Sequence, residues 1–145
     1  MAMQVRVAGS VDTSGIATTL AEAFFLDPVW GWAFADSTCR KAQHEAWFRL
    51  LIGSALPHQW VWTTPAYEAV SLWVPPGCPE LSESDEAQLG PMLEELLGTR
   101  AELVMEVFDR FEAAHPRTQD HYYLRTFDLP DGGPTVTTMW RETPP

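Results

Sequence analysis

Proline residues set the boundaries of most elements in this chain of 145 residues, which contains twelve of them. Proline fixes φ, lacks a backbone N–H and disfavours a helical residue before it, so it interrupts helices and strands. Asp27-Pro28 ends a first predicted helix and Pro57 ends a longer one. Pro75-Pro76-Gly77 separates a predicted pair of strands from two later helices. The breaks therefore predict a series of short helices and strands.

Hydrophobic periodicity assigns the segments between these breaks, because apolar residues three and four apart indicate helices and alternation indicates strands. Helices are expected over 16–24, 29–35, 37–55, 84–97 and 100–114, and strands over 4–7, 59–63, 69–74, 121–129 and 135–142. Pro130-Asp131-Gly132-Gly133 is a strong hairpin signal between the last two strands. This order predicts one α+β domain over residues 1–145, with helices packed on a largely antiparallel sheet of about five strands.

The charge of the chain excludes several kinds of partner. Twenty acidic residues against nine basic ones give a formal net charge of −11. A nucleic-acid backbone and an anionic membrane surface are both bound through Lys and Arg, so neither is an expected partner. Cationic ligands such as amines are compatible with this charge.

Cysteine and histidine spacing predicts neither a disulfide framework nor a metal site. Cys39 and Cys78 each stand alone, without a CxxC pair or histidines at metal-ligand spacing. The N-terminal residues lack the long apolar stretch of a signal peptide, and no apolar run approaches membrane-spanning length. We therefore expect a cytoplasmic protein without a metal.

Three stretches resemble a known family. "AVSLWVPPG" at 69–77, "HYYL" at 121–124 and "LPDGGPTVTTMWRE" at 129–142 occur in the order of a third strand, a fourth strand and a closing hairpin. Together they resemble the GNAT (Gcn5-related N-acetyltransferase) family, and in particular its puromycin-acetyltransferase-like actinobacterial branch. The resemblance covers nearly the whole chain and implies a GNAT-like fold.

The segment that holds acetyl-CoA in that family is missing. There, the fourth strand leads to an Arg/Gln-x-x-Gly-x-Gly/Ala loop whose backbone N–H groups bind the coenzyme pyrophosphate at a helix N-terminus. Here "HYYL" runs directly into "RTFDLPDGG". The resemblance thus implies a truncated GNAT-like fold that binds no cofactor. The loss would expose a sheet surface, for which homodimerisation is the expected cover.

His121 and Tyr123 are the candidate catalytic residues, because the resemblance places them at the start of a strand that often carries a base or relays a proton. They share one strand face if the alternation holds. An imidazole can shuttle a proton near neutral pH and a phenol can donate or orient one. The alternative is that both rings pack beneath neighbouring helices.

Asp27, Trp30 and Trp32 are candidate substrate-binding residues, since a carboxylate among indoles suits a cation. The alternative is that Asp27-Pro28 is only a helix stop and the Trp residues are core.

Trp62, Trp73 and Trp140 come from three predicted strands and could line one aromatic cavity, or belong to an ordinary core. His44, on an apolar helix face, is expected to be a satisfied core residue. His58, beside Pro57 at a helix end, is expected to be a surface or capping residue.

The favoured functional hypothesis is a repurposed GNAT-fold enzyme of specialised metabolism. It would act on an aromatic or amine-bearing small molecule by acid/base chemistry (cyclisation, condensation or isomerisation) without acetyl-CoA. The alternatives are a non-catalytic protein that binds a small molecule or dimerises, as a resistance or accessory factor, and an atypical N-acetyltransferase.

Overall fold

The computed structural model describes residues 4–75, 77–114, 125–128 and 135–138. Contacts divide the chain into two compact units, Met1–Leu89 and Gly90–Pro145. Among the described residues no helix has both the length and the apolarity to cross a membrane.

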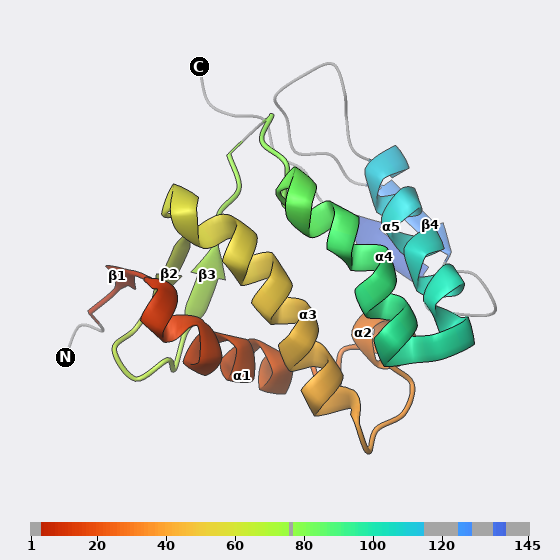
Figure 1. Ribbon diagram of the computed structural model, residues 1–145, viewed down its shortest axis with the longest axis horizontal. Coiled ribbons are helices and arrows are strands. Elements are labelled where there is room, and N and C mark those ends of the chain that lie inside the picture. The colour runs from red at the N-terminus through yellow and green to blue at the C-terminus, as the bar shows by residue number, and fades with distance from the viewer. Residues whose placement is uncertain (1–3, 76, 115–124, 129–134, 139–145) are drawn as a thin grey trace. The chain divides into compact units, whose positions relative to one another are not determined.

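The first unit contains three antiparallel strands and the helices packed beside them (Figure 1). Its elements are β1 (Arg6–Val7), α1 (Thr13–Ala23), α2 (Pro28–Ala33), α3 (Arg40–Ala55), β2 (Val61–Thr63), β3 (Val70–Leu72) and the start of α4 (Glu83–Leu97). Short 3-10 turns occupy Ser10–Asp12 and Leu56–His58. The second unit holds the rest of α4, the 3-10 turn Gly98–Arg100, α5 (Ala101–Ala114), and β4 (Arg125–Asp128) paired with β5 (Thr135–Thr138).

The expected fold class, a truncated GNAT-like fold built on one antiparallel sheet of about five strands, is wrong. β1–β2–β3 form one sheet and β4–β5 a separate two-stranded one, while most described residues are helical. The alternating runs at 59–63 and 69–74 form strands of only three residues each. The late start of β2 has a local cause. Gln59 has a φ of 61°, a left-handed conformation that does not fit an extended strand.

Helices α1 and α3 lie side by side and bury the main core of the first unit (Figure 1). Ile16 and Ala17 on α1 and Ile52 on α3 are fully buried, as is Val61 on β2. Burial of an aliphatic side chain of this size stabilises a fold by about 1.5–3 kcal/mol. The same helix pair therefore anchors the inner face of the sheet.

The carboxylate of Asp12 ties β1 to the start of α1 and to the β2–β3 connection. Both guanidinium ends of Arg6 donate to it at 2.8 Å, the backbone N–H of Gly9 donates at 2.8 Å, and the Tyr67 hydroxyl donates at 3.0 Å. The hydrogen bonds from Arg6, above all, hold the pKa of Asp12 well below its usual range. Thr19 on α1 donates to the Tyr67 carbonyl at 2.8 Å, so Tyr67 is fixed at both ends.

Arg40, at the start of α3, holds the α2 segment by donating to backbone carbonyls. Its guanidinium reaches the carbonyl oxygens of Phe34 at 2.7 Å, Phe25 at 3.1 Å, Ala35 at 3.1 Å and Gly31 at 3.3 Å. It also lies over the Phe25 ring, 5.2 Å from the centroid. One cation thus satisfies carbonyls in and around α2 that the short helix leaves without partners.

Two glycines give a matched test of this packing. A Cβ on Gly15 would come within 2.4 Å of the Tyr67 ring, whereas a Cβ on Gly53 meets nothing within 4 Å. We predict that Gly15→Ala lowers the free energy of unfolding by roughly 1–3 kcal/mol, because the held ring cannot move aside. Gly53→Ala should raise it by about 0.5–1 kcal/mol through helix propensity. Urea denaturation followed by circular dichroism measures both, and stabilisation by Gly15→Ala would contradict the packing described.

Candidate functional site

Strand β2 sends its alternate side chains to opposite sides of the sheet. Val61 and Thr63 are buried, at 0% and 1% exposure, on the side of the helices. Because successive residues of a strand point to opposite faces, Trp62 lies on the other face, where its side chain remains 39% exposed.

The register of the sheet gathers two further indoles on the face that carries Trp62. Trp62 pairs with Ser71 across the sheet, and the backbone N–H of Trp73 donates to the Trp60 carbonyl at 2.9 Å, one step further along the same ladder. Directly opposed residues in an antiparallel pair share a face, as do residues two apart in a strand. Trp60, Trp62 and Trp73 therefore lie on one face, which we call the indole face.

Among the described residues, the side chains that the strand register places on the indole face carry no charge, and several of them are exposed. Trp73 is 66% exposed. On the neighbouring strand Val7 pairs with Trp62, and Val5, two residues earlier, is 58% exposed. Apart from the small hydroxyl of Ser71, these side chains are apolar, in a chain whose net charge is −11. Contiguous exposed apolar surface on a folded protein is a common mark of a binding site.

Asp27 is the N-cap of α2. Its Oδ1 accepts hydrogen bonds from the N–H groups of Val29 at 2.9 Å and Trp30 at 3.0 Å, and Pro28 occupies the first helical position. This arrangement supports the structural reading of Asp27 as a helix boundary. Its proposed role toward a cation stays a prediction.

Trp30 packs within an aromatic cluster rather than beside an open cavity. Its ring centroid lies 5.7 Å from Trp47 and 6.3 Å from both Phe34 and Phe48. Trp32, on the same short helix, is half-buried. Trp30 therefore belongs to this aromatic cluster, and the role of Trp30 and Trp32 toward a substrate stays a prediction.

His44 is the titratable residue at the centre of the aromatic cluster. It is fully buried and meets Phe34 edge-on at 5.0 Å and Phe48 at 6.1 Å. The carbonyls of Ala21 and Trp30 approach the ring, but neither ring nitrogen reaches hydrogen-bond geometry. Burial lowers the pKa of His44, and these carbonyls only partly oppose it. His44 is a core residue, as expected, but not a satisfied one.

The structure brings together only part of the predicted site. Trp62 and Trp73 share the indole face and are both exposed. That they line one cavity together with Trp140 stays a prediction. His121, Tyr123 and Trp140 lie outside the described residues. Trp60 was missed as a site residue, although its spacing of two from Trp62 was a usable signal.

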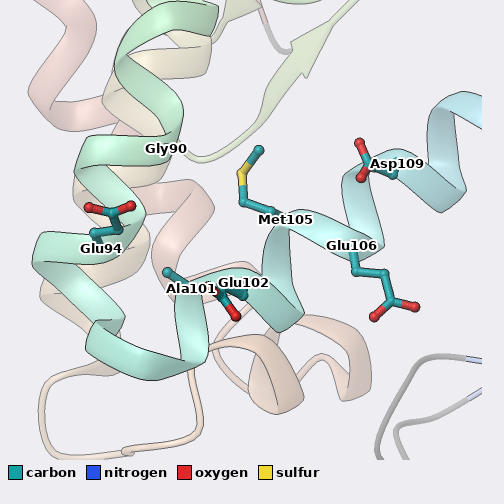
Figure 2. A pocket seen from close by; sticks show the side chains of 7 residues that line it. All are labelled: Gly90, Glu94, Ala101, Glu102, Met105, Glu106 and Asp109. Atoms are coloured by element: carbon teal, nitrogen blue, oxygen red, sulfur yellow. The ribbon is translucent and has the colours of Figure 1, made fainter.

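An acidic groove lies between α4 and α5 in the second unit (Figure 2). Its volume is about 250 Å³, with Met105 among four carboxylate side chains: Glu94, Glu102, Glu106 and Asp109. Arg110 donates to Glu106 at 2.6 Å and neutralises part of this charge. Nothing beyond negative charge indicates a ligand here, so the groove is not part of the candidate site.

Comparisons with protein-family models, curated proteins and solved structures give no match to this chain. Membership of the GNAT family therefore stays a prediction. Within the part of the chain that the structure describes, no group of three His, Cys, Asp or Glu side chains is placed to hold a metal ion.

The burial of His44 predicts acid sensitivity of the first unit. Because folding lowers the pKa of His44, the folded state favours the neutral imidazole. Its contribution to stability is present above the unfolded-state pKa, about 6.5, and is lost as the pH falls through the lower folded-state pKa. Arg40 opposes protonation and Asp27 favours it. We predict that the urea midpoint falls between pH 7 and pH 5, and that His44→Phe removes most of this slope. An unchanged slope in His44→Phe would assign the acid sensitivity to other groups.

Proposed function

We propose that this chain is a binding protein whose indole face takes an amine-bearing aromatic small molecule. The observation that carries the proposal is the gathering of Trp60, Trp62 and Trp73 on one sheet face of a chain with net charge −11. The ring of the ligand would stack on an indole, and its amine would be attracted by the indole quadrupole and by the negative charge of the chain.

The exposed indoles supply two attractive interactions. A flat ring stacks on an indole, and an ammonium group near an indole face is attracted by the ring quadrupole, by about 0.5–1 kcal/mol at an exposed site. The negative charge of the chain adds a long-range attraction for cations that salt screens. A ligand with both a ring and an amine should therefore bind more tightly than a ligand with only one of these groups.

This proposal follows the binding alternative raised from the sequence, that of a ligand-sequestering resistance factor or an accessory protein. Its residues Trp62 and Trp73 belong to the described strands or lie beside them. Acid/base catalysis by His121 and Tyr123 rests on residues outside the described ranges, so it has no structural support of the same kind.

Isothermal titration with tryptamine tests the proposal, with 3-methylindole and propylamine supplying the ring and the amine separately. We predict that tryptamine binds more tightly than either fragment and that its affinity falls as salt is added. Trp73→Ala and Trp62→Ala should each weaken tryptamine binding by roughly three- to tenfold, because each removes one ring.

Leu26→Ala is the matched control, because Leu26 is an apolar residue that is 85% exposed but belongs to the connection between α1 and α2 and not to a strand. Its affinity for tryptamine should equal that of the parent protein. Absence of tryptamine binding, or equal affinity in the parent and both Trp variants, would refute a ligand site on the indole face.

A further inference from the structure

The side chain of His58 stacks on Trp60, one of the three indoles of this face. Its imidazole lies over the Trp60 ring with the centroids 4.3 Å apart and the planes 21° from parallel, a stacked arrangement. His58 is itself exposed, while Trp60 is half-buried. The chain therefore places one of its own nitrogen heteroaromatic rings, the His58 imidazole, on the Trp60 indole.

The local backbone brings His58 back over Trp60. Leu56–His58 form a 3-10 turn with Pro57 at its start, and Gln59 follows in the left-handed region with φ 61°. This conformation is uncommon for a residue other than glycine, and such positions cluster at functional sites. Because the turn reverses the chain between His58 and Trp60, two rings that are two residues apart can stack.

We propose that His58 is a specificity-determining residue of the indole face, holding the place on Trp60 that a planar nitrogen heteroaromatic ring of the ligand would take. This inference rests on the proposed function. A ligand confined to Trp62 and Trp73 binds without disturbing His58. A ligand that extends to Trp60 must first displace the imidazole, so His58 disfavours it.

The stack also identifies the chemical class that fits Trp60. A five-membered ring with two nitrogens stacks on the indole with the ring centroids 4.3 Å apart, so a free imidazole-like ring has the size and shape to replace it. Removal of the His58 side chain should open this place while leaving the rest of the sheet unchanged, because the side chain is exposed.

Nitrogen-15 NMR of the indole N–H groups tests the proposal with 4-methylimidazole as the probe. In His58→Ala, 4-methylimidazole should shift the Trp60 indole resonance with at least a fivefold lower midpoint concentration than in the parent protein. His58→Phe keeps a stacked ring and should respond like the parent. Equal midpoints in all three proteins, or weaker binding in His58→Ala, would overturn the assignment of His58.

Tryptamine separates failure of this inference from failure of the proposed function. Shifts of Trp62 and Trp73 on adding tryptamine, together with an unchanged Trp60 response to 4-methylimidazole in His58→Ala, would remove the role of His58 and leave the indole face as a binding site. If tryptamine shifts neither Trp62 nor Trp73, the site itself is absent and the role of His58 is lost with it.

Discussion

The two-residue periodicity of β2 is the constraint from which the candidate site follows. Val61 and Thr63 are buried beside the helices, so the residue between them has to lie on the opposite face. A shift of one residue in register would bury Trp62 and expose Val61, and the fully buried core residues of α1 and α3 leave little space for an indole. Close packing on one face of the sheet thereby fixes the position of the indoles on the other.

In the helices of the first unit, two charged side chains form hydrogen bonds with the backbone and hold α2 in place. Arg40 donates to four backbone carbonyls around α2, and Asp27 accepts two N–H groups at the start of that helix. With α2 held in this way, Trp30 packs on Trp47 and closes the cluster around His44. Trp30 thus belongs to the aromatic cluster, whereas Trp62 and Trp73 on the sheet are exposed.

Sequence periodicity located the helices well, because their burial depends on neighbours three and four residues away: the predicted 84–97 and 100–114 correspond to Glu83–Leu97 and Ala101–Ala114. Helix α4 even continues through Pro91. The division of the strands between two sheets was not predictable, since strand pairing depends on contacts distant in sequence. The stacking of His58 on Trp60 could not be predicted from the sequence either. It requires Gln59 to adopt a left-handed conformation, which a glutamine residue does not indicate.

Intermolecular nuclear Overhauser effects between tryptamine and assigned indole protons test most directly whether the open sheet face is where this protein meets its ligand. We predict cross-peaks from the ligand ring to Trp62 and Trp73, and none to Trp47, which is 4% exposed. Cross-peaks confined to side chains of the α4–α5 groove, such as the Met105 methyl group, would contradict it and move the site to the second unit.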